Sequence, residues 1–161
     1  MDKSYSVKIE FLGKHPEFLP ELAKLHFDEW CHFSPGKTLE DRICKLQELA
    51  ASGALPFMVV AIKGDQLVGS AALVYEDMKT RKDLSPWLAS IFVKPKFRRK
   101  GIATALIRYI ENSAAELGIR KLYLFTEHAR DLYARLGWND MEECEYQGVR
   151  VVIMSKRLDA D

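Results

Sequence analysis

Apolar and polar residues follow two periodicities along the chain, and together these predict its secondary structure. Alternating or β-branched apolar runs predict strands, which we expect at residues 5–12, 57–63, 66–75, 87–93, 121–125 and 149–155. Apolar residues spaced three and four apart predict amphipathic helices, which we expect at residues 16–30, 38–51, 101–117 and 129–136. Thr38 and Asp41 form a capping-box-like pattern that supports the start of the second helix. The predicted order is β, α, α, β, β, β, α, β, α, followed by one or two strands.

This order predicts a mixed α/β fold, with helices covering both faces of a central sheet. Gly64-Asp65 separates the second and third predicted strands and is a hairpin turn signal, so we expect these strands to be antiparallel. The polar segment 76–86 is the longest irregular stretch and a candidate functional loop. Because the 161 residues contain no repeat, linker or low-complexity tract, we expect a single domain over residues 1–161.

The overall composition limits the classes of function. The 24 Lys and Arg residues nearly balance the 23 Asp and Glu residues, for a net charge of +1, which disfavours nucleic acid as a partner. Three cysteines without a C-x-x-C pair suit a reducing compartment, so we expect a cytoplasmic protein. The sequence has no leader-like segment and no long apolar run, so no membrane partner is expected. The histidines show no metal-ligand spacing, and no metal is expected.

The segment KPKFRRK, residues 94–100, holds five cations in seven residues directly before the third predicted helix. Such a cluster can contact nucleic acid, an anionic membrane or only water. Its position favours a different ligand, because a helix N-terminus presents unpaired N–H groups and a partial positive charge, which suit phosphate. The letters match neither the P-loop nor the G-x-G-x-x-G dinucleotide motif.

The stretch RRKGIA, residues 98–103, resembles the R/Q-x-x-G-x-G/A signature of the GNAT superfamily of N-acetyltransferases. Two flanking segments support this resemblance. SIFVKPKF is similar to the family's V-x-P-x-[FY] strand exit through Val93, Pro95 and Phe97. TEHARDLYARLGW is similar to N-x-x-A-x-x-L-Y-x-x-x-G-[FY] through Ala129, Leu132, Tyr133, Gly137 and Trp138. The resemblance implies a GNAT-like fold with a splayed central sheet and acetyl-CoA as the cosubstrate.

The resemblance also implies how acetyl-CoA binds. In the family, backbone amides of the loop hold the pyrophosphate, and the splayed strand binds pantetheine as an extra strand would. On this chain the implied cofactor-binding residues are Ile91, Phe92, Val93, Arg98, Arg99, Lys100, Gly101, Ile102, Ala103, Thr104 and Thr126. Three positions depart from the family pattern. Arg99 stands where Gly is commoner, Thr126 where Asn is usual and Trp138 where Phe or Tyr is usual, and the second departure puts a side-chain amide contact in doubt.

Acetyl transfer to an amine needs a base for the amine and a proton or hydrogen bond for the leaving thiolate. Tyr133 matches the position at which many members have a tyrosine near the coenzyme sulfur, and the alternative is an amphipathic core tyrosine. The place of a frequent family glutamate is taken by Trp87, and no carboxylate occurs in residues 86–93. The candidate bases are therefore Glu76 and Asp77, which alternatively form a solvated strand end.

The predicted acceptor groove combines carboxylates with aromatic rings, which suits a cationic amine. The implied aromatic residues are Trp30, Trp87 and Tyr146, and the nearby acidic residues are Asp28, Glu29, Glu76, Asp77, Glu143 and Glu145. Both tryptophans also fit core positions. Lys79, Arg81 and Lys82 favour an acidic acceptor instead, so the charge of the acceptor stays open.

The residues and the resemblance together predict an N-acetyltransferase that acts on a primary amine of a small molecule or a peptide. The predicted mechanism is direct attack of the amine in a ternary complex. One alternative is a GNAT-fold sensor that holds acyl-CoA without turnover, and another is nucleic-acid binding through KPKFRRK. GNAT proteins are often dimers, so the resemblance also leaves a homodimer open.

Overall fold

The predicted alternation of strands and helices is present in the computed structural model, which describes residues 6–158. In chain order the elements are β1 (Lys8–Phe11), α1 (Leu19–Trp30), α2 (Leu39–Ala51), β2 (Phe57–Lys63), β3 (Gln66–Val74), β4 (Trp87–Val93), α3 (Ile102–Glu116), β5 (Lys121–Thr126), α4 (Arg130–Arg135), β6 (Asn139–Tyr146) and β7 (Val149–Arg157). The predicted order is confirmed, with two strands after α4. The first predicted helix begins as a 3₁₀ turn at Pro16–Phe18, and residue 5 of the first predicted strand lies outside the described residues.

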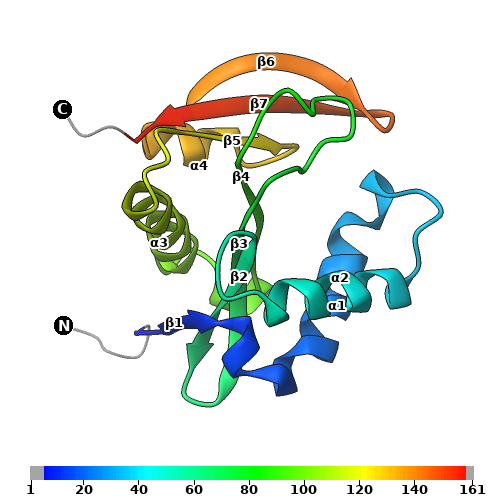
Figure 1. The fold of residues 1–161 in the computed structure, drawn as a ribbon, viewed down its shortest axis with the longest axis vertical. Helices are drawn as coiled ribbons and strands as arrows, with labels where there is room; N and C mark the ends of the chain where they lie inside the picture. The colour runs from blue at the N-terminus through cyan, green and yellow to red at the C-terminus, as the bar shows by residue number, and fades with distance from the viewer. Residues whose placement is uncertain (1–5, 159–161) are drawn as a thin grey trace.

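The strands form one sheet in the order β1-β2-β3-β4-β5-β7-β6. The β2 and β3 strands pair antiparallel from Lys63 opposite Gln66, as the Gly64-Asp65 turn predicts. Figure 1 shows α1 and α2 on one side of the sheet and α3 and α4 on the other. Each pair of helices buries its apolar face against the sheet, and two hydrophobic clusters result. The expectation of a mixed α/β sheet with helices on both faces is therefore confirmed.

The sheet opens at its centre, between β4 and β5. These two strands run parallel, and only Trp87 and Tyr123 pair across them. In β4 the register against β3 also shifts, so that Ser90 and Ile91 oppose a single residue, and Ser90 has a φ of +56°. A residue in this left-handed region marks a bulge that redirects the strand. The expected splay of the central sheet is present at this point.

The second helix shows how local sequence fixes the start of an element. The Thr38 hydroxyl oxygen accepts a hydrogen bond from the Asp41 N–H at 3.1 Å, and the Asp41 carboxylate accepts one from the Thr38 N–H at 2.8 Å. The capping box that the sequence predicts is therefore formed. No helix within residues 6–158 is long and apolar enough to cross a membrane.

A carboxylate is buried on the α3 side of the sheet. Glu111 is 6% exposed, and its two oxygens accept hydrogen bonds from Trp138 Nε1 at 2.9 Å, Arg108 Nη1 at 2.8 Å and Lys156 Nζ at 3.0 Å. The indole N–H that distinguishes Trp138 from the usual Phe thus joins α3 to the segment after α4. All partners are satisfied, so this group stabilises the packing of α3 on β7.

We expect Glu111→Gln to lower the free energy of unfolding by about 2 kcal/mol, because the partly buried ammonium of Lys156 loses its counter-charge. Urea unfolding at pH 7 measures the change. The matched control is Glu116→Gln, an exposed position at the end of the same helix, which should change stability by less than about 0.5 kcal/mol. Equal unfolding midpoints for the two variants would contradict a stabilising role for Glu111.

Candidate active site

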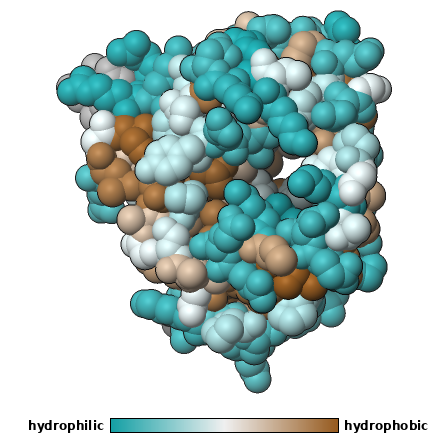
Figure 2. Space-filling view, turned by 45° about the vertical axis from the view of Figure 1, so that its right-hand side comes forward, coloured by the Kyte–Doolittle hydropathy of each residue, from teal (hydrophilic) through white to brown (hydrophobic). Residues whose placement is uncertain are grey.

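A cavity of about 820 Å³ lies where β4 and β5 separate. Its walls come from the end of α1, the 3₁₀ turn Cys31–Phe33, α2, the facing edges of β4 and β5, and α4. Figure 2 shows that this side of the molecule is hollowed, with hydrophilic residues around the opening. The opened centre of the sheet therefore creates a site that a ligand can enter, and it exposes unpaired backbone groups of both strands to that ligand.

Tyr133 lines this cavity from α4 and is 7% exposed. Its ring packs edge-on against Trp138 at 6.1 Å, and no residue in the described range bonds its hydroxyl. Burial, with a further contribution from the negative charge of Asp77, raises the pKa of Tyr133 well above its usual value. The phenol is thus held neutral, and its hydroxyl is available to donate to a ligand. Tyr133 therefore lies in the same cavity as Asp77, and its role at the coenzyme sulfur stays a prediction.

The two candidate bases occupy different places. Both residues are exposed, but only Asp77, in the loop after β3, lines the cavity. The Asp77 side chain meets solvent through the cavity but has protein around it, and this desolvation raises its pKa to about 7 against the opposing charges of Arg42 and Lys45. Asp77 therefore stays the candidate base, and Glu76 lies outside the cavity wall.

Four residues that the sequence analysis did not single out form a hydrogen-bonded chain, and three of them, His26, Arg42 and Ser90, line the cavity. Arg42 Nη2 donates to His26 Nδ1 at 2.7 Å, His26 Nε2 bonds the Ser70 hydroxyl at 2.8 Å, and that hydroxyl donates to the Ser90 carbonyl oxygen at 2.8 Å. Burial, and then the charge of Arg42, lower the pKa of His26 well below its usual value, so the ring is neutral. Arg42 Nη2 also donates to the Ser90 hydroxyl at 3.2 Å, so the chain holds the bulge at Ser90 from both its side chain and its carbonyl oxygen.

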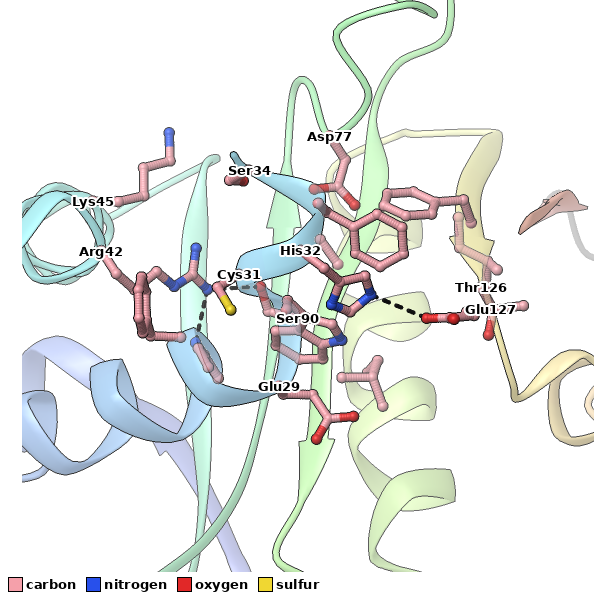
Figure 3. Close-up of a pocket in the computed structure, with 18 of the residues that line it drawn as sticks. Glu29, Cys31, His32, Ser34, Arg42, Lys45, Asp77, Ser90, Thr126 and Glu127 are labelled. Atoms are coloured by element: carbon pink, nitrogen blue, oxygen red, sulfur yellow. Dashed lines mark hydrogen bonds and ion pairs between the residues drawn. The ribbon is translucent and has the colours of Figure 1, made fainter. Parts of the chain in front are cut away.

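A second contact crosses the cavity. His32 Nε2 and the Glu127 carboxylate are 3.1 Å apart, and they join the 3₁₀ turn after α1 to the end of β5 (Figure 3). Both residues line the cavity. Neither belongs to a motif, so no pattern in the sequence identifies this pair.

The predicted acceptor aromatics divide into two groups. Trp30 and Tyr146 line the cavity, and the Tyr146 hydroxyl accepts a hydrogen bond from the Lys79 N–H at 3.1 Å, which anchors the loop that carries Asp77. Trp87 is fully buried outside the cavity wall, and its indole N–H donates to the Leu84 carbonyl at 2.7 Å. The expectation that Trp87 contacts the acceptor is therefore not supported, because its ring belongs to the core beneath the site.

The charged residues expected near the acceptor are also only partly in the cavity. Of the acidic set, Glu29 and Asp77 line it, while Asp28 pairs with Lys24 and Glu143 lies near Arg150 on the β6–β7 hairpin. Of the basic set, only Lys79 lines the cavity. Arg81 forms ion pairs with Asp83 and Glu142, and Lys82 is exposed outside the cavity. Glu145 lies on β6 and does not line the cavity either.

The predicted cofactor residues divide between the cavity wall and the loop before α3. Ile91 and Thr126 line it, whereas the side chains of Phe92 and Val93 are buried, which leaves their proposed backbone roles unaffected. The Thr126 hydroxyl oxygen accepts a hydrogen bond from the Ala129 N–H at 2.9 Å and so shapes the entry to α4. The threonine that departs from the family pattern therefore has a structural partner in place of an amide contact.

The loop before α3 has the conformation that an anion-binding turn needs. Arg99 and Gly101 have φ values of +65° and +84°, and Gly101 precedes a helix whose N-terminus has no side-chain cap. A Cβ atom at Gly101 would meet nothing within 4 Å, so space is open in front of the first N–H groups of α3. Arg98 braces this loop, because its Nε donates to the Val93 carbonyl oxygen at 2.7 Å. Lys100, Ile102, Ala103 and Thr104 complete the predicted set at this turn.

Comparisons with known proteins agree with this architecture. Residues 19–138 match the model of the Acetyltransferase (GNAT) family. A 77-residue segment is 34% identical to thialysine N-epsilon-acetyltransferase of Bos taurus, and this match spans 45% of the chain and 45% of that relative, less than half of its length. An aminoglycoside 6'-N-acetyltransferase complexed with coenzyme A superimposes with a TM-score of 0.75 at 17% identity, over 96% of this chain and 98% of that one. The aminoglycoside 6'-N-acetyltransferase from Enterococcus faecium gives a TM-score of 0.73 at 19% identity, over 96% and 98% of the two chains.

The two structural neighbours establish the fold, and the family model covers most of the chain, including β4, the loop before α3 and Tyr133. The chain therefore belongs to the acetyltransferase (GNAT) family.

Proposed function

We propose that the protein is an N-acetyltransferase that transfers the acetyl group of acetyl-CoA to a primary amine of a small molecule or a peptide. The observation that carries this proposal is the juxtaposition of Asp77 and Tyr133 in one cavity at the opening between β4 and β5. An amine acylation needs a proton acceptor and a stabiliser of the leaving sulfur in one place, and these two residues supply both.

The chain offers a fitting site for the coenzyme. The open space at Gly101 and the uncapped amides of α3 suit a pyrophosphate, and the backbone of Ser90 and Ile91, which β5 does not pair, suits the amides of pantetheine. When bound there, acetyl-CoA supplies the thioester that is the acetyl donor. A backbone N–H at the β4 bulge would then donate to the thioester oxygen and stabilise the charge that develops on it.

Asp77 is the proposed general base. A carboxylate with a pKa of about 7 is largely ionised at slightly alkaline pH and is still basic enough to accept a proton from an attacking amine. In the reaction the amine nitrogen forms a bond to the acetyl carbon, the carbon–sulfur bond breaks, and the proton of the amine passes to Asp77 directly or through water. The proposal is for direct transfer in a ternary complex, since this reaction needs no acylated side chain.

Tyr133 is the proposed stabiliser of the leaving thiolate. A thiol has a pKa of about 8.5 and an ordinary tyrosine one of about 10, so full proton transfer from tyrosine to the thiolate is uphill even without burial. The raised pKa of Tyr133 strengthens this argument. We therefore propose that its hydroxyl donates a hydrogen bond to the sulfur and that the proton finally acquired by the thiolate comes from solvent or from protonated Asp77.

The test is release of free thiol from acetyl-CoA with a panel of primary amines, including thialysine, the amine in the name of the bovine relative. We expect turnover above the rate of hydrolysis with at least one acceptor, and an acetylated product detected by mass spectrometry. Tight binding of acetyl-CoA with no transfer to any amine would support the sensor alternative. The nucleic-acid alternative has its own test: if the segment KPKFRRK binds DNA or RNA, coenzyme A should displace it.

A further inference from the structure

The cavity contains a guanidinium group without a carboxylate partner. Arg42 Nη2 donates to His26 Nδ1 at 2.7 Å and to the Ser90 hydroxyl at 3.2 Å, which uses both of its hydrogens. Its Nε is buried and has no hydrogen-bond partner, and Nη1 has none among residues 6–158 either. Since unpaired buried donors are rare and costly, the guanidinium has donors to spare for a bound group.

The surroundings of Arg42 add positive charge. Lys45 lies one turn further along α2, and Lys37 and Lys79 also line the cavity. In Figure 3 Arg42 extends from α2 towards Ser90, with Lys45 beside it and Asp77 across the cavity. Within the described chain neither Arg42 nor Lys45 forms an ion pair. This wall of the cavity therefore attracts an anionic group.

Within the described residues, no carboxylate of the cavity wall forms an ion pair with Arg42 or Lys45. Asp41 is engaged in the capping box with Thr38, and Glu127 pairs with His32. Glu29 lies on the other side of Ser90 from Asp77 in Figure 3, and Glu48 is exposed further along α2. Asp77 is left as the anionic group opposite Arg42 and Lys45, and both cations influence its charge.

We infer that the acceptor is a small amine that also carries a carboxylate, with the carboxylate bound by Arg42 and Lys45 and the amine placed at Asp77. This inference rests on the proposed transfer to an amine and specifies its substrate class. Arginine binds carboxylates through its planar array of donors, and the charged hydrogen bonds so formed are the strong ones. A zwitterion matches Asp77 with its amine and Arg42 and Lys45 with its carboxylate, whereas an amine without a carboxylate leaves these two cations without a counter-charge.

Pairs of amines that differ only by a carboxylate provide the first test. L-Lysine and 1,5-diaminopentane form one pair, and L-alanine and ethylamine form another. We expect the acid-bearing member to have the higher kcat/KM, by at least about 10-fold, as charge-assisted hydrogen bonds imply. Equal values, or a preference for the diamine, would overturn the inference while leaving acetyl transfer itself demonstrated.

Variants assign the preference to residues. Lys45→Gln and Arg42→Met should each lower the ratio of kcat/KM values within a pair, and the double variant should bring it close to 1. The ratio is the useful quantity, because any loss of order at Ser90 in Arg42→Met affects both members of a pair. Lys82→Gln removes an exposed cation outside the cavity and should leave the ratio unchanged. An unchanged ratio in the double variant would overturn the assignment.

Direct binding separates this inference from the proposed function. Saturation-transfer NMR with pentanoate and with pentylamine, in the absence of acetyl-CoA, requires no turnover. We expect pentanoate to bind wild-type protein and not the double variant. If no amine is acetylated but pentanoate binds in this way, the proposed function fails and the carboxylate site stands. If pentanoate gives the same signal with both proteins, the carboxylate site fails, whatever the activity.

Discussion

Replacement of Asp77 by Asn should lower kcat/KM for acetyl transfer at pH 8 by about 100-fold or more, which is the usual contribution of a general base. The wild-type profile, divided by the neutral fraction of the amine, should rise tenfold per pH unit below about 7 and level off above it, because the base acts in its ionised form. The Asn variant should lose this ionisation. Initial rates between pH 5.5 and 9 measure both effects.

The controls for this prediction use the neighbouring carboxylate and the stability of the variant. Glu76→Gln changes an adjacent residue that does not line the cavity, so we expect near wild-type rates. The folded-state pKa of Asp77 is raised above its unfolded value, so its contribution to stability is present below about pH 4 and is lost as the pH rises through about 7. Asn does not ionise, so the Asp77→Asn variant avoids this loss of stability. It should be at least as stable as wild type at pH 8. A wild-type rate in the Asn variant would exclude Asp77 as the base.

The sequence predicts the helices, the strands and the loop before α3 better than it predicts the residues inside the cavity. Apolar periodicity defines most strands and helices, because each buries one face, but β6 escapes it, since seven of its eight residues are at least partly exposed at the sheet edge. The loop before α3 is recognisable because its chemistry is local. A left-handed residue, an open approach and a helix N-terminus all occur within a few positions of Arg99 and Gly101.

The interior of the cavity follows from tertiary structure and has no local pattern. His26, Arg42, Ser70 and Ser90 come from α1, α2, β3 and β4, and they meet only when the sheet is assembled. A buried histidine on an amphipathic helix gives no indication that it is neutral or that it holds a bulge. The same limit explains why two predicted site residues do not line the cavity. Trp87 and Glu76 lie close in sequence to residues of the site, but the fold buries Trp87 in the core and leaves Glu76 outside the cavity wall.

We expect Gly101→Glu to weaken coenzyme A binding by about 100-fold or more. Gly101 has a φ of +84° and its Cβ position is open, so the new side chain meets no protein atom near the backbone and extends into the space before α3. It would place a negative charge where the pyrophosphate is proposed to bind, and it would occupy the same N–H groups. Isothermal titration with coenzyme A measures the loss.

A second glycine separates this effect from backbone strain. Gly64, in the turn between β2 and β3, has a φ of +63° and also has open space at its Cβ, so Gly64→Glu imposes a similar strain far from the proposed site. Its coenzyme A affinity should equal that of wild type, while both variants lose about 1 kcal/mol of stability. Gly101→Ala carries the strain without the charge and should bind with intermediate affinity. A carboxylate near a helix N-terminus stabilises the folded protein, so it should offset part of the strain at residue 101. Gly101→Glu should therefore stay folded during the titration, and the loss of affinity then reports on binding. Unchanged affinity in Gly101→Glu would show that the pyrophosphate binds elsewhere.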